Sequence, residues 1–334
     1  MKQRVLVTGG TGYIGSHTVI ALLEQGHEVV IADNLSNSER KVLDRIEKIT
    51  GRHVTNYEVD LCDREATFEV FEKEGPIDGV IHFAAYKCVP ESVSQPIMYY
   101  RNNLNSLLNV LEACEKYHVP NLIFSSSCSI YGEVSQLPVT EATPAGVAAC
   151  PYAHTKQIGE GMIRAFCEKS SGFNAILLRY FNPVGADMSG LNGELSPDTP
   201  NNLMPIIMET GIGKRKEMTV YGTDYDTRDG SCIRDYIYVV DLAKAHVKAI
   251  DRMLNEKGRD QVEVFNLGTG RGLSVLEIIR GFEQATGVKL NYEIVGRREG
   301  DIEQVWAKAD KANNVLGWKA DTPILDVLRS AWNW

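Results

Sequence analysis

The chain has 334 residues, of which 43% are apolar and 24% are charged, and both values are ordinary for a globular protein. Its length predicts two domains, and a net charge of −9 argues against a nucleic-acid partner. Seven scattered cysteines without a CxxC pair argue against disulfides and a metal site, and they suit the cytoplasm. Neither a signal peptide nor an apolar run of membrane-spanning length is seen, so no membrane partner is expected.

The first predicted elements form a glycine-rich turn between a strand and a helix. A β-branched strand at Arg4–Val7 runs into TGGTGYIG, and an amphipathic helix follows. Gly9 allows a tight turn, Gly12 lets the backbone approach a pyrophosphate, and Gly15 lets the helix pack against its strand. The free N–H groups at the helix start then face the phosphates. This context predicts a dinucleotide-binding βαβ unit.

An acidic residue ends the second predicted strand, Glu28–Asn34. Asp33 lies 18 residues after Gly15, where a carboxylate can accept both ribose hydroxyls of an adenosine. It would repel a 2′-phosphate, so the expected cofactor is NAD rather than NADP. The alternative is an ordinary polar residue at a strand end.

Strands and helices continue to alternate, which predicts a Rossmann-type doubly wound parallel sheet with ligands at the carboxyl ends of its strands. The further strands of this half are Thr55–Val59, Asp78–Phe83, Asn121–Ser125 and Ala175–Tyr180, with a helix at Asn102–Tyr117. Residues 1–180 are therefore expected to form the NAD-binding domain.

Residues 181–334 are expected to form a smaller α/β domain, with the chain free to cross between the two. A loop rich in Gly, Pro, Asn and Asp spans Asp187–Asn202. It is followed by a strand at Met218–Tyr221, a helix at Asp241–Leu254, a strand at Val262–Leu267 and a helix that begins at Ser274 with a capping box to Glu277.

The stretch PYAHTK places Tyr152 four residues before Lys156, which is neighbouring spacing on a helix that Pro151 can start. An ammonium beside a phenol, together with the positive nicotinamide ring of the expected cofactor, favours the phenolate and lowers its pKa, so Tyr152 could take a proton from a sugar hydroxyl. Ser127, after a strand end, could orient that hydroxyl. The alternatives are an ordinary surface pair and a serine that only caps a strand.

Ordered motifs along almost the whole chain resemble the UDP-glucose 4-epimerase family of the extended short-chain dehydrogenase/reductase superfamily. They are TGGTGYIGSHT, DNLSNS, ESV-x-x-P-x-x-YY-x-NN, SSS-x-x-x-YG, PY-x-x-TK, LLRYFNPVGA, NNLMP, RDYI-x-V-x-DLA, FNLGTG and RREGD. The resemblance implies an isomerase with retained NAD that interconverts UDP-galactose and UDP-glucose through a 4-keto sugar. It makes Tyr152 the base and then the acid at O4, with Ser127 and Lys156 as its catalytic partners.

The resemblance also implies the remaining contacts. The cofactor would be bound by Gly9, Gly12, Tyr13, Ile14, Gly15, Asp33, Asn34, Asn37, Ser38, Asp60, Leu61, Phe83, Ala84, Ala85, Lys87, Asn102, Ser125, Tyr152, Lys156 and Tyr180. The UDP-hexose would be bound in the second domain and its border by Ser127, Phe181, Asn182, Asn202, Leu203, Thr219, Tyr221, Arg234, Arg298, Asp301 and Val305. Tyr180 and Phe181 would flank the nicotinamide. A homodimer is implied through the regions Tyr99–Tyr117 and Tyr152–Phe166.

One position departs from the tyrosine that accompanies restriction to UDP-glucose and UDP-galactose in the family. Val305 stands there, four residues after Asp301, and it is smaller. We expect a wider sugar site with some activity on UDP-GalNAc and UDP-GlcNAc, unless Trp306 fills the space.

Three other functions compete with this interpretation. A sugar-nucleotide 4,6-dehydratase would carry an Asp-Glu pair where this chain has Cys128 and Ser129. An epimerase of UDP-uronic acids or dTDP-sugars is a stronger alternative. A non-catalytic NAD-sensing protein would typically have lost the tyrosine or the lysine, and both are present.

Overall fold

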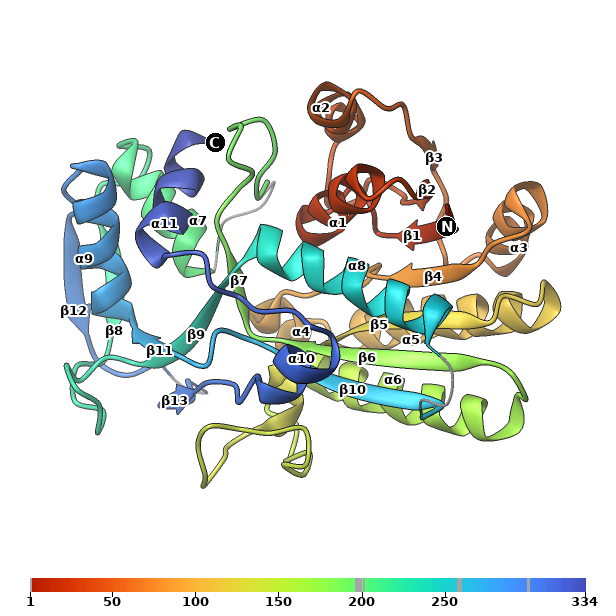
Figure 1. The fold of residues 1–334 in the computed structure, drawn as a ribbon. Coiled ribbons are helices and arrows are strands. Elements are labelled where there is room, and N and C mark those ends of the chain that lie inside the picture. Colours follow the sequence, from red (N-terminus) through yellow and green to blue (C-terminus); the bar gives the residue numbers. More distant parts are fainter. Residues whose placement is uncertain (1, 196–199, 201, 257–259, 299–300) are drawn as a thin grey trace.

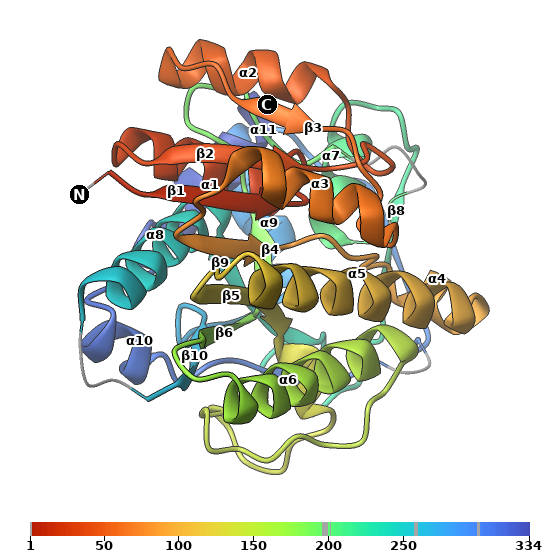
Figure 2. The same cartoon turned by 90° about the vertical axis from the view of Figure 1, so that its right-hand side faces the viewer.

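The computed structural model describes residues 2–195, 200, 202–256, 260–298 and 301–334, so parts of the NNLMP and RREGD motifs lie outside the described residues. Within the described part, seven parallel strands form one large sheet (Figures 1 and 2). Their order across the sheet is β10 (Val262–Leu267), β6 (Asn174–Tyr180), β5 (Asn121–Ser127), β4 (Gly79–His82), β1 (Arg4–Thr8), β2 (Glu28–Ala32) and β3 (Thr55–Tyr57). The predicted doubly wound sheet is confirmed.

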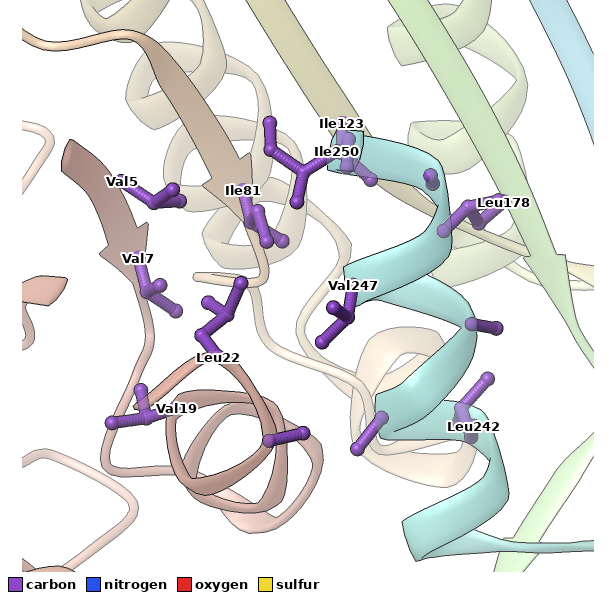
Figure 3. Close-up of a cluster of buried hydrophobic side chains, with 14 of the residues drawn as sticks. Val5, Val7, Val19, Leu22, Ile81, Ile123, Leu178, Leu242, Val247 and Ile250 are labelled. Atoms are coloured by element: carbon purple, nitrogen blue, oxygen red, sulfur yellow. The ribbon is translucent and has the colours of Figure 1, made fainter. Parts of the chain in front are cut away.

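Helices cover both faces of this sheet (Figure 2). One face carries α1 (Tyr13–Glu24), α2 (Lys41–Thr50) and α8 (Val239–Asn255), and the other carries α3 (Arg64–Glu74), α5 (Pro96–Lys116) and α6 (Pro151–Lys169). Figure 3 shows Leu22 of α1 between Ile81 of the sheet and Val247 of α8, with Val19 of α1 near Val7. Near-continuous apolar runs such as VLV and LIF fit strands that are buried on both faces.

The large sheet draws on both halves of the chain. β10 pairs with β6 in parallel, with Val262 opposite Ala175 and Leu267 opposite Tyr180. α8 packs beside α1, and α10 (Asp310–Val315) packs near β10. The chain therefore leaves the large domain after β6, enters the smaller domain and returns, so a single boundary near residue 180 does not divide it in space.

The smaller domain consists of short strands with helices around them (Figure 1). One sheet contains β7 (Asn182–Val184), β9 (Ile233–Tyr238), β11 (Gly272–Ser274) and β13 (Gln304–Val305), and a second pairs β8 (Met218–Tyr221) with β12 (Tyr292–Val295). The helices are α7 (Leu203–Gly211), α9 (Val275–Thr286) and α11 (Ile324–Asn333), while α4 (Val89–Ser94) and a 3-10 turn at Cys128–Tyr131 lie in the large domain.

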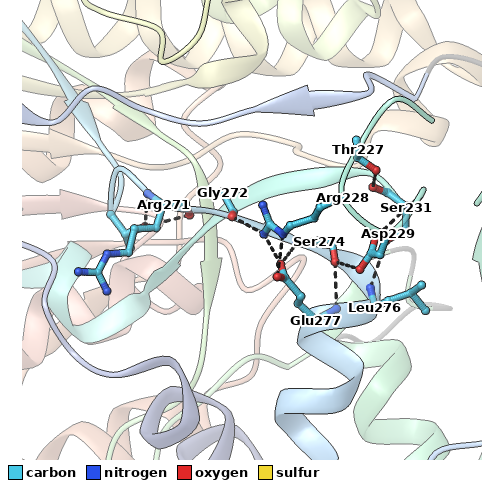
Figure 4. Close-up of polar contacts among 10 residues, drawn as sticks. Thr227, Arg228, Asp229, Ser231, Arg271, Gly272, Ser274, Leu276 and Glu277 are labelled. Atoms are coloured by element: carbon cyan, nitrogen blue, oxygen red, sulfur yellow. Dashed lines mark hydrogen bonds and ion pairs between the residues drawn. The ribbon is translucent and has the colours of Figure 1, made fainter.

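A polar cluster fixes the start of α9 (Figure 4). The Ser274 hydroxyl accepts a hydrogen bond from the Glu277 N–H at 3.0 Å, and the Glu277 carboxylate accepts from the Ser274 N–H at 2.8 Å. The predicted capping box is thereby confirmed. Arg228 also binds the Glu277 carboxylate, and Asp229 accepts from the Ser274 hydroxyl, so the loop before β9 is tied to this helix.

Candidate active site

Glycines shape the loop between β1 and α1. Gly9 has a φ of +69°, and a Cβ there would lie 2.7 Å from the Ala84 nitrogen. A Cβ on Gly15 would lie 2.1 Å from the Gly9 carbonyl oxygen, so the helix can start this close to the loop only with glycine. The N–H groups of Tyr13 and Ile14, in the first turn of α1, lack intrahelical partners and are free to face a phosphate. This cradle, which a side chain would fill, fits a dinucleotide pyrophosphate.

Asp33 lies just beyond β2 and is 9% exposed. Its Oδ2 accepts from the Thr11 N–H at 3.1 Å, and its Oδ1 accepts from the Leu35 N–H at 2.9 Å. A carboxylate has about four acceptor sites, so lone pairs remain for a ribose diol. The Ser38 and Thr11 hydroxyls, 2.6 Å apart, tie the same loop to the glycine turn. β2 ends at Ala32 rather than at Asn34, because Leu35 takes a left-handed backbone conformation with a φ of 59° and turns the chain.

Lys87 lies beside the first turn of α1. Its Nζ is 5.9 Å from the Tyr13 ring centroid and forms an ion pair with the Glu194 carboxylate at 3.1 Å. The Tyr13 hydroxyl donates to the Gly185 carbonyl at 2.5 Å. Lys87, an expected cofactor contact, thus lies beside the glycine cradle, and its partner Glu194 was not predicted.

Tyr152 and Lys156 lie one turn apart on α6, at the carboxyl end of β5. Tyr152 is only partly exposed and Lys156 is 5% exposed, so the alternative of a surface pair is wrong. The Lys156 Nζ donates to the Ser125 carbonyl at 2.6 Å and to the Ser125 hydroxyl at 3.2 Å. It lies 5.9 Å from the Tyr152 ring centroid. Both side chains therefore face the carboxyl edge of the sheet.

Burial shifts the pKa values of both members of this pair. It raises the pKa of the Tyr152 phenol to about 12, and the hydrogen bond from Ser127 offsets only part of that rise. Burial also lowers the pKa of the Lys156 ammonium to about 7. In the chain by itself, desolvation therefore outweighs the groups that favour the phenolate.

Ser127 is the last residue of β5 and stands opposite Tyr180 of β6. Its hydroxyl accepts from the Ser129 N–H at 3.1 Å and from the Ser129 hydroxyl at 2.9 Å. Ser127 therefore caps the following 3-10 turn while its hydroxyl also reaches the Tyr152 phenol. The capping role and the expected place next to Tyr152 are compatible.

Two buried polar residues near the site were not predicted. His246 of α8 contacts the Tyr180 hydroxyl, and Asp235 of β9 accepts backbone hydrogen bonds from the loop after β10 and from Ala307. A sequence signal existed for the histidine, because it stands four residues after Leu242 on an otherwise apolar helix stripe. Asp235 gave no signal beyond its place in the RDYI motif.

The expected nucleotide contacts form a cluster in the smaller domain. Arg298 pairs with Asp301 at 2.7 Å, and its guanidinium carbon lies 5.1 Å from the Tyr221 ring centroid. Thr219 lies on the same face of β8 as Tyr221, because successive strand side chains alternate. A planar cation beside an aromatic ring is suited to a uridine diphosphate.

Val305 and Arg234 are paired on neighbouring strands β13 and β9. Val305 is 5% exposed and belongs to an apolar cluster with Phe181. The Trp306 ring lies on the other side, since a Cβ on Gly272 would lie 3.0 Å from it. Trp306 therefore does not occupy the space next to Val305.

The other residues that are expected to contact the cofactor or the substrate lie in different environments. The Leu61 side chain is buried in the core, so only its backbone can meet a ligand, whereas Asp60 and Asn34 are exposed. Phe83 and Ala85 are partly exposed just after β4. The remaining ones are Asn37 in the exposed loop after β2, Asn102 on α5, Asn182 at the start of β7, and Asn202 and Leu203 at the start of α7.

A comparison with protein-family models matches residues 5–268 to the NAD dependent epimerase/dehydratase family. The chain belongs to this family. The glycine cradle and Asp33 described above are the residues that fit its cofactor, and NAD is confirmed as the cofactor of the family.

The relatives within this family include UDP-glucose 4-epimerases. The one from Bacillus subtilis (strain 168) is 47% identical, covering 99% of this chain and 96% of its own. A crystal structure of UDP-glucose 4-epimerase from Bifidobacterium longum in complex with NAD+ and UDP has a TM-score of 0.94 at 47% identity, covering 99% and 97%. That from Stenotrophomonas maltophila with bound NAD and formylated UDP-arabinopyranose has a TM-score of 0.96 at 42% identity, covering 99% and 97%. The resemblance deduced from the motifs is confirmed.

Proposed function

We propose that this protein interconverts UDP-galactose and UDP-glucose by epimerisation at C4. The observation that carries the proposal is the arrangement of Tyr152, Ser127 and Lys156 at the carboxyl edge of the sheet, the edge at which the glycine cradle after β1 also lies. The full-length similarity to UDP-glucose 4-epimerases supports the same substrates.

In this mechanism Tyr152 takes the proton from O4 of the hexose and later returns it. The Ser127 hydroxyl, which already reaches the phenol, orients O4 between them. Because burial opposes the phenolate, positive charge must stabilise it, and Lys156 supplies one charge from one helical turn away. When bound, NAD supplies a second positive charge and accepts and returns the hydride at C4.

The chain divides binding between two regions. Arg298 and Arg234 of the smaller domain would hold the diphosphate, while the sugar would meet mostly apolar surfaces near Phe181 and Val305. Tight binding of the nucleotide and few polar contacts to the sugar would allow the 4-keto sugar to turn over and accept hydride on its other face.

A 4,6-dehydratase is not supported. Burial raises the pKa of the Cys128 thiol to about 12, so this thiol is no proton carrier.

The direct test uses purified protein with UDP-galactose and no added NAD, with the products separated by chromatography. We expect UDP-glucose to appear, and we expect NAD to be released when the protein is denatured. The absence of product even with added NAD would contradict the proposed function.

We further propose that the site accepts N-acetylated sugars, because Trp306 points away from Val305. UDP-GalNAc is expected to yield UDP-GlcNAc in the same assay. In Val305→Tyr, the ratio of kcat/KM for UDP-GalNAc over UDP-galactose is expected to fall by about tenfold or more, as a larger side chain narrows the site. Trp306→Phe is the matched control and should leave that ratio unchanged. Undetectable turnover of UDP-GalNAc by the unmodified protein would refute this extension.

A homodimer and a cytoplasmic location complete the proposal. Ile97, Leu104 and Leu108 fall at i, i+7 and i+11 on one stripe of α5, and Ile97 and Leu108 are 66% and 50% exposed. α5 and α6 lie side by side (Figure 2), and Tyr100 and His154 form a hydrogen bond of 2.8 Å between them. The seven cysteines are scattered along the sequence without a CxxC pair, which supports a reducing compartment. None of the helices in the described ranges has the length and apolar character needed to cross a membrane.

Leu108→Glu is expected to convert the dimer into a monomer, because a carboxylate would have to be buried in an apolar contact. Size-exclusion chromatography with light scattering measures the mass. Ile212→Glu, which changes another exposed apolar side chain (66%) on the smaller domain, is the matched control and should stay dimeric. A monomeric unmodified protein, or a dimeric Leu108→Glu, would contradict this interface.

A further inference from the structure

His246 stands at one end of a row of polar groups that leads through Tyr180 and Ser125 to Lys156. Its Nδ1 lies 2.9 Å from the Leu242 carbonyl oxygen, which can only accept, so Nδ1 carries the proton. Its Nε2 is then an acceptor, and the Tyr180 hydroxyl, 2.5 Å away, must donate to it. The imidazole therefore fixes the direction in which the Tyr180 hydroxyl points.

The direction continues from Tyr180 to Lys156. Ser125 lies near enough to the Tyr180 phenol to lower its pKa, and because Tyr180 donates to His246, Ser125 can meet the phenol only as a donor. The lone pairs of the Ser125 hydroxyl then face the Lys156 ammonium, which donates to it at 3.2 Å. Each group in the row thus has a fixed place as donor or acceptor. The row runs from the Lys156 ammonium on α6 to the Leu242 carbonyl on α8.

The surroundings hold His246 in its neutral state. It is completely buried, the Phe83 ring lies 4.8 Å away, and burial lowers the pKa of the imidazole to about 4. Lys156 is the charged group nearest in this row, and Ser125 and Tyr180 stand between it and the imidazole. Among the described residues, no carboxylate is paired with the imidazole. At neutral pH the ring is one fixed donor and one fixed acceptor.

We propose that His246 is a positioning residue of the active site, which orients the Tyr180 phenol and, through Ser125, the ammonium of Lys156. The inference rests on the proposed function in so far as Lys156 and Tyr180 act in epimerisation. His246 does not touch the reacting atoms itself. It lies 66 residues after Tyr180 in sequence, so the chain's return to the large sheet is what brings this support to the site.

The kinetic test compares His246→Phe, which removes the acceptor but keeps a ring, with His246→Gln, whose amide oxygen can accept from Tyr180. His246→Phe is expected to lower kcat for UDP-galactose by about ten- to a hundredfold while KM changes less than about threefold, since small misplacements at a reacting site have effects of this size. His246→Gln should recover most of this loss. His27→Phe, at another buried histidine near Asp251, is the control and should change neither constant.

The same mechanism predicts non-additive losses. Tyr180→Phe combined with His246→Phe should be no slower than the slower single variant, because both remove the same hydrogen bond. Multiplied losses, or equal kcat values for His246→Phe and His246→Gln, would overturn the proposal.

A measurement independent of activity separates this inference from the proposed function. Nuclear magnetic resonance of ring-labelled histidines should show His246 as the neutral Nδ1–H form from pH 8 to pH 6, identified by its loss in His246→Gln. Tyr180→Phe should shift its Nε2 resonance. An Nε2–H form of His246, or a resonance that does not change in Tyr180→Phe, would overturn the proposal even if the protein catalyses epimerisation. If the spectra are as expected but no epimerisation is found, the proposed function is wrong and not this inference.

Discussion

Replacing Tyr152 with phenylalanine is expected to lower kcat for UDP-galactose by about a hundred- to ten-thousandfold, the usual contribution of a positioned proton-transfer group. The change removes one hydroxyl and keeps the ring on α6, so the helix and the contacts of Lys156 with Ser125 should persist. Steady-state rates from separated products give kcat, and NAD released on denaturation shows whether the cofactor is still bound.

The control for this prediction is Tyr117→Phe. Tyr117 lies at the end of α5 against Phe68 and Phe71, remote from the carboxyl edge of the sheet, and its loss of a hydroxyl should leave kcat unchanged. A Tyr152→Phe protein that keeps more than a tenth of the original kcat with bound NAD would exclude Tyr152 as the proton carrier.

Replacing Arg179 with methionine is expected to lower the free energy of unfolding by about 3–5 kcal/mol, because it leaves a buried carboxylate without its cation. The Arg179 guanidinium binds both oxygens of Glu160 at 2.9 and 2.7 Å, and both side chains are 8% exposed. Glu160 also accepts from the Ser126 hydroxyl at 2.6 Å, directly between Ser125 and Ser127 of β5. Denaturant titration of the protein with bound NAD measures the change.

Two further variants isolate the cause. The double variant Arg179→Met with Glu160→Met removes both charges and should regain most of the lost stability. Arg64→Met breaks an exposed pair with Glu112 and should leave the unfolding free energy almost unchanged. An Arg179→Met protein as stable as Arg64→Met would show that the buried pair contributes nothing.

Local signals in the sequence were enough to predict the elements that build the cofactor site. The turn at Gly9 and Gly15 and the capping box at Ser274 depend on neighbouring residues, and both were recognised. The strands β7, β11 and β13 were not predicted, because two or three residues carry no periodicity and their pairing joins distant segments. β10 was predicted with its correct bounds, but its place next to β6 depends on a partner about ninety residues earlier, which no local pattern contains.

Local patterns were enough to predict which side chains lie together at the strand ends, but not the energetics of these groups. Helical spacing placed Tyr152 beside Lys156, and strand ends placed Ser127 near them. The pKa of the phenol depends on desolvation by surrounding elements, which no local pattern contains. His246 was missed for a related reason, since its role appears only when α8 lies against the end of β6. The direction in which Trp306 points likewise follows from the pairing of β13 with β9.

The return of the chain to the large sheet has a consequence for any attempt to separate the two domains. A fragment that stops after β6 would lack β10 and α8, so β6 would become an open edge with unpaired backbone groups and α1 would lose its apolar cover. Such an edge invites pairing with other chains and aggregation. The large domain is therefore a unit in space but not a piece of chain that can be cut out, and the segment that forms the smaller domain is an insertion into it.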